Sequence, residues 1–277
     1  MVAWLRHKGF LGTLFGGGLD RRYHIAALQH PAHGMLWACG KVSPTEQFSH
    51  SMRTLDEMLA ASPWTRALPA DQLQRARSSI IVRDLEPGGH ACRKGDPASA
   101  WLGVIDGLVK LTCLSASGKS VTLAIVPTAS WFGEGSVLKS ETRKYDVVAL
   151  RKSRVALMPE ATFFWLLDTS ISFNRFILTQ LNERFGQFVA TLEHDRLLEP
   201  EARVAQTLAN MLHPQLYPGH AHCVKLSQDE LGLLVGVSRQ RISRALQVLE
   251  KAGLIKLDYR AIRVQDIEGL RRFGGAE

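Results

Sequence analysis

Three arginines lie close together near the end of the chain, in the stretch VGVSRQRISRALQVLEKAGLI, residues 235–255. Arg239, Arg241 and Arg244 follow a Gly-x-Ser turn, and apolar residues recur beside them at helical spacing: Ile242, Leu246 and Leu249. Such a stripe packs one face of a helix against a core and leaves the guanidinium groups on the other face. Arginine pairs bidentately with guanine, and glutamine with adenine. We therefore expect this helix to contact double-stranded DNA.

Two short helices position these arginines. Ser227-Gln228-Asp229-Glu230 is a capping box, in which the serine hydroxyl caps the helix start and the glutamate reaches back. Gly236-Val237-Ser238 interrupts this first helix, Ser238 caps a second one, and Gly253 ends it. Two short helices joined by a three-residue turn that contains glycine form a helix-turn-helix. The following LIKLDYRAIRV, residues 254–264, predicts a two-stranded wing.

The second helix of a helix-turn-helix presents its N-terminal residues to base edges in the major groove. The candidate DNA-binding set is Ser238, Arg239, Gln240, Arg241, Ser243 and Arg244, with the serines expected to meet phosphate. Ten basic and six acidic residues lie between Lys225 and Arg272. Further candidates for phosphate contact without sequence specificity are Lys251, Lys256, Arg260 and Arg263. The alternative is a solvated charged helix.

Length, charge and cysteine spacing limit the classes of protein to which this chain can belong. The chain has 277 residues, enough for two domains, and a formal net charge of +8, which suits a polyanionic partner. No apolar run approaches the roughly 20 residues that span a bilayer, so we expect a cytoplasmic protein without a membrane partner. The four cysteines are scattered: Cys39, Cys92, Cys113 and Cys223. This spacing argues against a zinc site or an iron–sulfur cluster and favours reduced thiols.

Residues 1–50 differ from the rest of the chain, because glycine, histidine and isolated aromatic residues mix there without a steady period. Glycines break the short apolar stretch at residues 11–15, and no convincing cleavage site follows, which argues against a secretory signal. We expect a poorly ordered extension. The alternative is translation from an upstream start codon, with Met35, Met52 or Met58 as the start of the native protein.

Residues 51–170 predict a first folded domain. A helical pattern, broken by Pro63 and Pro69, runs to about residue 76. Short β-branched runs then follow up to residue 158, separated by turn residues. Many short strands at this spacing predict an antiparallel sandwich or barrel. Asp106-Gly107, between two apolar runs, predicts a β-hairpin.

Residues 171–198 have a helical period with a heptad seam. The seam residues recur at alternating spacings of three and four: Leu178, Leu181, Phe185, Phe188 and Leu192. A seam on a single helix that leaves a small barrel favours pairing with the same helix of a second subunit. The alternative is packing within one chain. A hinge near Glu199-Pro200 leads into residues 199–277, the predicted winged helix-turn-helix domain.

From about residue 55 to its C-terminus, the chain resembles the Crp/Fnr family of bacterial transcription regulators. Residues 226–255 carry most of the resemblance, and KGDPASAWLGVIDGLVKL (94–111) and RVAQTLANML (203–212) also fit. The resemblance implies an α+β fold: an N-terminal antiparallel β-roll like that of cyclic-nucleotide-binding proteins, a long dimerisation helix and a C-terminal winged helix-turn-helix. It also implies a homodimer on a two-fold-symmetric operator, with recognition helices about 34–36 Å apart, and RNA polymerase as a further partner.

The segment WFGEGSVLKSETRKYDVVA, residues 131–149, stands where cyclic-nucleotide-binding members have their phosphate-binding cassette. In those members a glutamate holds the ribose hydroxyl and an arginine pairs with the cyclic phosphate. The resemblance therefore implies an effector site at Gly133, Glu134, Arg143 and Lys144. Backbone amides at a glycine turn plus one guanidinium suit a phosphate. The effector is unknown; a cyclic nucleotide or dinucleotide is the candidate.

Two departures argue against a receptor specific for cAMP. The small hydroxyl residue expected after the arginine is Lys144, which would suit a second phosphate. The hydroxyl pair that reads the adenine falls at Phe188-Val189, whose side chains neither donate nor accept. One alternative is an ion pair between Glu134 and Arg143 in an unoccupied roll. The chain would then be an effector-independent regulator or a protein-interaction module.

Haem binding and catalysis each require particular ligands or sequence motifs. Haem requires an axial ligand; His90 and Cys92 lie together, but a surface turn at residues 87–95 explains them equally well. The sequence has no nucleophile elbow, HExxH, P-loop or paired-carboxylate motif, so we expect no catalytic residues, no metal site and no enzyme. In the expected mechanism an effector between roll and long helix shifts the seam, and a hinge at residues 197–200 reorients the DNA-binding domains.

Overall fold

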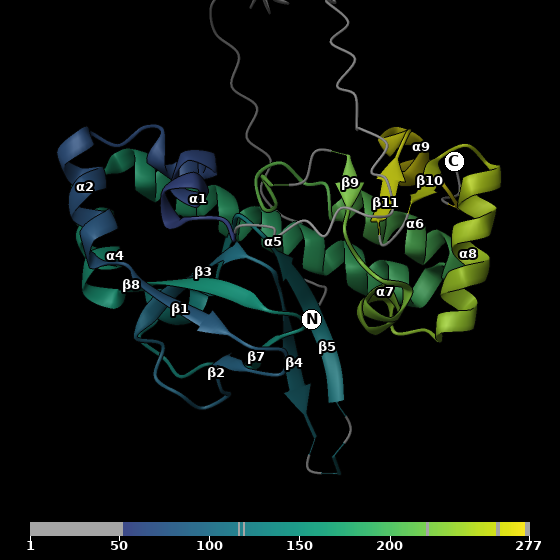
Figure 1. Ribbon diagram of the computed structural model, residues 1–277, viewed down its shortest axis with the longest axis horizontal. Helices are drawn as coiled ribbons and strands as arrows, with labels where there is room; N and C mark the ends of the chain where they lie inside the picture. Colours follow the sequence, from purple (N-terminus) through teal and green to yellow (C-terminus); the bar gives the residue numbers. More distant parts are fainter. Residues whose placement is uncertain (1–51, 116, 119, 220–221, 259–260, 275–277) are drawn as a thin grey trace, which may run out of the picture. The chain divides into compact units, whose positions relative to one another are not determined.

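A computed structural model of the chain describes residues 52–274, apart from 116, 119, 220–221 and 259–260. Residues 1–50, expected to be a poorly ordered extension, lie outside the described residues. Within the described part, a β-roll with flanking helices comes first, then the long helix α5, then a winged helix domain (Figure 1).

Short helical segments precede the roll: α1 (Leu55–Ala61), the 3-10 turn η1 (Pro63–Thr65) and α2 (Ala70–Ser79). Thr54 and Glu57 form a capping box at the start of α1. Pro63 opens η1, and Pro69 is the cap residue before α2. The predicted breaks at the two prolines are therefore confirmed, because proline cannot continue a helix but can start one.

The roll consists, within the described residues, of two four-stranded antiparallel sheets, ordered β1-β8-β3-β6 and β2-β7-β4-β5. The strands are β1 (Ile81–Leu85), β2 (His90–Cys92), β3 (Ala100–Asp106), β4 (Leu108–Leu114), β5 (Ser120–Pro127), β6 (Ser130–Phe132), β7 (Asp146–Ala149) and β8 (Ser153–Pro159). The short helix α3 (Glu134–Leu138) follows β6. Leu102 and Val104 of the first sheet share one buried core with Val126 and Val147 of the second, as expected for a sandwich.

The hairpin predicted at Asp106-Gly107 is wrong. β3 and β4 follow each other across this pair, but β3 pairs with β8 and β6, whereas β4 pairs with β5 and β7. Gly107 has a φ of +99°, and the Leu108 N–H donates to Ser153 Oγ. The turn therefore carries the chain from one sheet to the other. A local Asp-Gly signal cannot reveal this, because distant strands decide the pairing.

Two strands of three residues were not predicted. His90–Cys92 forms β2 and pairs with β7, so the surface turn proposed for residues 87–95 is wrong at its centre. The second, β6, pairs with β3. Burial in the roll raises the pKa of the Cys92 thiol, which keeps it neutral. Strands of three residues, such as β2 and β6, are too short to show the alternation of apolar and polar residues that marks a strand in a sequence.

An aromatic cluster joins the roll to the helices. Trp101 stacks on Trp131 with ring centroids 4.4 Å apart, and Trp64 meets Trp131 edge-on at 5.5 Å. Phe163 of α4 (Glu160–Thr169) and Phe173 of α5 pack against Trp101. All five side chains are buried. Aromatic pairs in offset or edge-to-face contact add to the stabilisation from burial, so this cluster anchors the start of α5 on the roll.

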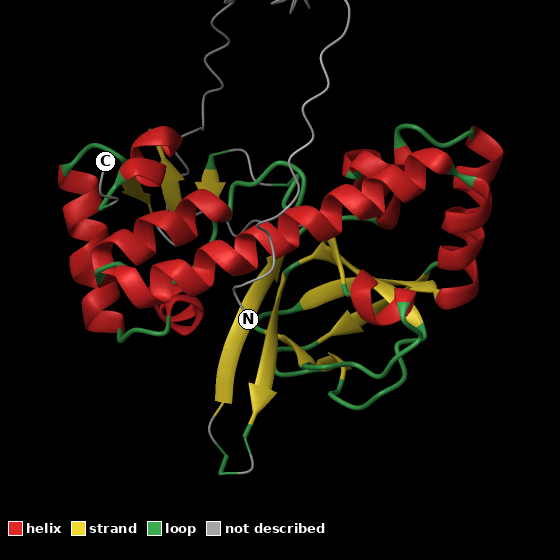
Figure 2. Cartoon of the chain, turned by 180° about the vertical axis from the view of Figure 1, so that it is seen from behind, coloured by secondary structure: helices red, strands yellow, loops and turns green. Residues whose placement is uncertain are grey.

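The long helix α5 (Ile171–Leu197) matches the predicted range closely and begins at a cap from the Ser170 hydroxyl. Figure 2 shows it running from α4, beside the roll, to α6 (Pro200–Asn210) in the winged domain. Pro200 is the first residue of α6, as its helix-starting preference predicts. No helix among the described residues is long and apolar enough to cross a membrane.

The winged domain contains α7 (Gln228–Val235), α8 (Arg239–Lys251), β10 (Ile255–Asp258), β11 (Ala261–Val264), β9 (Cys223–Val224) and α9 (Ile267–Arg272). The predicted helix-turn-helix and wing are confirmed. The strand β9, which pairs with β11, and the helix α9 were not predicted. Leu108 and Ile125 of the roll are buried in the same cluster as Leu231 and Leu246, so the roll and this domain share an apolar contact.

We predict that Gly107→Ala destabilises the fold strongly. A Cβ atom there would lie 2.4 Å from Ser153 Oγ and 2.7 Å from the Lys152 carbonyl oxygen, and φ is left-handed. Gly88→Ala is the matched control, since its φ is +82° and no atom lies within 4 Å of the added Cβ. Urea denaturation should show a loss of about 1–2 kcal/mol for Gly88→Ala, the backbone strain alone, and roughly 3 kcal/mol or more for Gly107→Ala. Equal losses would contradict the role of the sheet-crossing turn.

Candidate functional site

The helix α8 has one buried face and one exposed face. Ile242, Ala245, Leu246 and Leu249 are buried in the core of the winged domain. The polar residues of the first turns are exposed: Arg239, Gln240, Arg241 and Arg244. The side chains predicted to contact DNA bases therefore lie together on the outer face of this helix.

Local caps hold α8 at a fixed angle to α7. The Ser227 hydroxyl accepts a hydrogen bond from the Glu230 N–H at 3.2 Å, and Glu230 Oε2 accepts one from the Ser227 N–H at 2.7 Å. Gly236 ends α7 with a φ of +74°. The Ser238 hydroxyl accepts from the Arg241 N–H at 3.5 Å and starts α8. Ser238 thus caps a helix, and Ser243 is half-buried; both had been expected to meet phosphate.

The charges on the exposed face of α8 are weakly compensated. Arg239 Nη1 lies 3.3 Å from Asp229 Oδ2, and both side chains are exposed, so this pair contributes little to stability. Arg241 and Arg244 make no ion pair within the described residues. The first-turn N–H groups of α8 add partial positive charge. The face therefore attracts a polyanion.

Of the other basic residues considered, Lys251 and Lys256 are exposed at the end of α8 and in the wing. Arg263 pairs with Asp258 across the wing at 2.8 Å. Arg260 lies outside the described residues.

The cassette residues of the roll are brought together but paired differently from the prediction. Gly133 has a φ of +82° and precedes α3. Glu134 is 1% exposed; its Oε1 accepts a hydrogen bond from Arg184 Nε at 2.8 Å, and its Oε2 accepts from Trp101 Nε1 at 3.4 Å. A buried carboxylate needs such partners, and its main partner comes from α5.

Arg143 is 3% exposed and turns toward the backbone. Its Nη1 donates to the Gly133 carbonyl at 3.2 Å, and its Nη2 donates to the Ala100 carbonyl. Its Nε has no hydrogen-bond partner within the described residues. The alternative of a Glu134–Arg143 ion pair is therefore wrong, because each side chain already has other partners.

Lys144 lies on the surface and pairs with Glu141 at 2.6 Å. Hydrogen bonds from Lys139 and Lys144 hold the pKa of Glu141 below its usual value, so this carboxylate stays ionised. The lysine considered for a second phosphate is thus partly neutralised.

Sequence reasoning missed Arg184. Besides Glu134, it binds the Trp131 carbonyl through Nη2 at 2.6 Å, and Gln180 Nε2 binds the same carbonyl at 3.3 Å. Burial raises the pKa of the nearby Tyr217 phenol, which stays neutral beside this guanidinium. The available signal was the i, i+4 spacing of two long polar side chains, Gln180 and Arg184, that border the seam of α5.

The seam of α5 is mostly exposed in the single chain. Leu178 is 66% exposed, Phe185 67%, Phe188 67% and Leu192 43%. Leu181 is the exception: it is half-buried and packs on the aromatic cluster. Among the described residues, no group of three or more His, Cys, Asp or Glu side chains is placed to hold a metal ion.

A roll, a long helix and a winged helix-turn-helix with an exposed basic face define a class of two-domain DNA-binding regulators. The comparisons agree. A model of the cyclic nucleotide-binding domain matches residues 82–170, and a model of the Crp-like helix-turn-helix domain matches residues 202–273.

Among curated relatives, the cyclic AMP receptor protein of Thermus thermophilus is 27% identical over 75% of this chain and 94% of that protein. A CRP-like cAMP-activated global transcriptional regulator of Mycobacterium tuberculosis is 22% identical over 79% of this chain and 99% of its own length. The chain belongs to the Crp/Fnr family of transcriptional regulators.

Solved structures support the fold. FixK2 from Bradyrhizobium japonicum matches with a TM-score of 0.60 and 18% identity, over 72% of this chain and 98% of that chain. The c-di-GMP-responsive regulator CLP of Xanthomonas campestris matches with a TM-score of 0.51 and 22% identity, over 71% and 99%.

Proposed function

We propose that this transcriptional regulator acts as a homodimer that reads a two-fold-symmetric DNA operator with α8. The observation that carries the proposal is the outer face of α8, where Arg239, Gln240, Arg241 and Arg244 are exposed above a fully buried stripe. A helix held in this way can enter the major groove with its N-terminal turns. RNA polymerase is the further partner that family membership suggests.

The exposed seam of α5 supports the dimer. Leu178, Phe185, Phe188 and Leu192 form one apolar face that nothing in the single chain covers, within the part that the structure describes. Monomeric soluble proteins rarely expose large contiguous apolar patches. The same seam on a second copy provides a matching surface with knobs-into-holes packing. Two winged domains then stand side by side, as two half-sites require.

We place the effector site of the regulator at Gly133, Glu134 and Arg143, for a cyclic nucleotide or dinucleotide. The unpartnered Nε of the buried Arg143 supports an anionic ligand. Binding would require Arg143 to exchange backbone carbonyls for phosphate. Since Arg184 of α5 holds Glu134, a ligand at Glu134 would act directly on the seam helix.

A second candidate is a regulator that needs no effector. Glu134 already has Arg184 and Trp101 as partners, and Arg143 already binds two carbonyls, so the cassette is largely satisfied by the chain itself. The cellular concentration of the regulator alone would then determine how much of its DNA operator is bound.

We predict that Arg244→Ala weakens binding to an operator selected from random DNA by about 10- to 100-fold, because a bidentate base contact is worth roughly 1–3 kcal/mol. Random-sequence DNA should lose much less affinity. Lys251→Ala, at the far end of the same helix, is the control and should weaken both DNAs alike. Fluorescence anisotropy at several salt concentrations measures this. Equal losses in Arg244→Ala would make it a phosphate contact, and salt-independent binding would reject the DNA proposal.

We predict that Phe188→Asp converts the dimer to a monomer, since it places a charge in the apolar seam. Leu123→Asp, which alters an equally apolar exposed residue on β5, should leave the dimer intact. Sedimentation equilibrium distinguishes the two. A dimer that survives Phe188→Asp and Phe185→Asp would show that the seam is not the interface.

We predict that calorimetric titration with cAMP, cGMP and cyclic di-GMP gives heat for one of them, and that Arg143→Ala abolishes it. Because Arg143 is buried, circular dichroism must first show that the variant is folded, and Glu134→Gln serves as a second, milder variant. Heat that persists in both variants would reject the cassette as the site. No heat with any nucleotide would favour the effector-independent regulator.

A further inference from the structure

A second pocket lies away from the cassette, where the roll meets the winged domain. Its volume is about 690 Å³, within the range of small-molecule sites. Turns of the roll line one side with Asp106, Thr128 and Arg151, and the winged domain lines the other side with Cys223 and Lys225. The pocket therefore touches both parts that a regulator must couple.

The two carboxylates that line this pocket, Asp106 and Glu57, already accept hydrogen bonds from nearby backbone and hydroxyl groups. Asp106 Oδ1 accepts hydrogen bonds from the Gly107 N–H at 2.9 Å and from the Thr128 hydroxyl at 3.4 Å, and Oδ2 accepts from the Arg53 N–H at 3.2 Å. Glu57 closes the capping box of α1, with Oε2 2.7 Å from the Thr54 N–H. Both carboxylates thus serve local turns rather than the basic side chains across the pocket.

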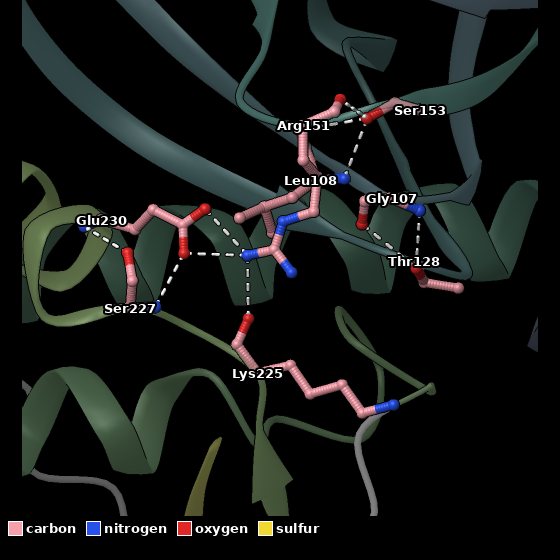
Figure 3. A network of polar contacts seen from close by, with 8 residues as sticks. All are labelled: Gly107, Leu108, Thr128, Arg151, Ser153, Lys225, Ser227 and Glu230. Atoms are coloured by element: carbon pink, nitrogen blue, oxygen red, sulfur yellow. Dashed lines mark hydrogen bonds and ion pairs between the residues drawn. The ribbon is translucent and has the colours of Figure 1, made fainter. Parts of the chain in front are cut away.

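Arg151 and Lys225, two basic residues that line this pocket, use only part of their hydrogen-bonding capacity within the described residues. Arg151 Nη2 donates to both carboxylate oxygens of Glu230 at 2.8 Å and to the Lys225 carbonyl at 3.1 Å. Figure 3 shows that the other terminal nitrogen of Arg151 is directed away from Glu230. The Lys225 side chain also extends away from Glu230. Neither that nitrogen nor the Lys225 ammonium has a hydrogen bond or ion pair with a described residue.

We propose that this pocket binds a small phosphate-bearing anion between Arg151 and Lys225. The planar guanidinium offers a second N–H edge when one nitrogen is committed to Glu230, and arginine forks match phosphate oxygens. Lys225 has no ion-pair partner among the described residues, and Arg151 keeps one terminal nitrogen beyond its pair with Glu230, so the two side chains can share the oxygens of one phosphate. Leu108, Pro127 and Cys223 give the pocket less polar walls that an organic group can cover.

The same arginine links the pocket to DNA binding. Glu230 closes the capping box of α7, the first helix of the helix-turn-helix, and Arg151 is its partner from the roll. An anion on the second N–H edge of Arg151 shares its positive charge with Glu230, which weakens this ion pair and so shifts the position of α7 relative to the roll. The coupling to DNA rests on the proposed DNA-binding function. By linkage, the anion changes DNA affinity by the factor by which DNA changes anion affinity.

The test is calorimetric titration of the full chain with inorganic pyrophosphate in the absence of DNA. Arg151→Gln and Lys225→Gln should each weaken binding by about tenfold or more, since each removes a charged contact. Arg154→Gln is the matched control: Arg154 makes a similar pair with Asp84 at 2.7 Å, but within the roll alone. Arg244→Gln controls for pyrophosphate on α8, and Arg143→Ala controls for the cassette. The controls should change the affinity less than about twofold.

The proposal is overturned by an absence of heat up to millimolar pyrophosphate, or by heat that survives both Arg151→Gln and Lys225→Gln. Loss of heat in Arg244→Gln or Arg143→Ala instead would place the anion on α8 or in the cassette, and would also overturn it. If Arg151→Gln does not fold, Lys225→Gln decides alone, because the Lys225 side chain is exposed. Binding is measured without DNA, so failure here leaves the DNA-binding proposal standing, and the reverse also holds.

Discussion

The ion pair between Glu134 and Arg184 sets the geometry on which the other sites depend. A carboxylate that is 1% exposed is costly unless charged or polar donors reach it, and Arg184 Nε does so at 2.8 Å. The helix α5 must therefore turn its 180 and 184 positions toward the roll. With 3.6 residues per turn, this rotation leaves Leu178 and Phe185 on the outer side. An interior charge pair thus helps to decide which apolar face of α5 stays exposed in the single chain.

A second ion pair, between Arg151 and Glu230, lies where the roll meets the winged domain. It joins a turn of the roll to the cap of α7, and the apolar contact of Leu108 and Ile125 with the winged core reinforces it. The outer face of α8 stays exposed under this arrangement. The roll therefore contacts the helix-turn-helix through its first helix, while the basic side chains on the outer face of α8 remain exposed.

Features that depend on neighbours in the chain could be predicted. The capping box at Ser227, the break at Gly236, the stripe of α8 and the extent of α5 all follow from side chains within a few turns of each other. The Asp106-Gly107 hairpin failed for the converse reason: strand partners lie far away in the sequence. Leu181 likewise fits the heptad, yet it packs on the aromatic cluster rather than facing out with Leu178.

The sequence by itself determined the order of the parts, the helix-turn-helix and its arginines, because caps and periodicity are local properties. The resemblance carried by residues 131–149 also pointed to Glu134 and Arg143 as the candidate cassette, which stays a prediction. Only the tertiary structure decided their partners: Arg184 reaches Glu134 from 50 positions away, and Arg143 turns to backbone carbonyls. The pocket between the roll and the winged domain also arises only on folding, because Arg151 of the roll and Lys225 of the winged domain come from separate parts of the chain. A charged side chain is paired by whatever the packed backbone brings near it, and spacing along the chain does not encode that distance.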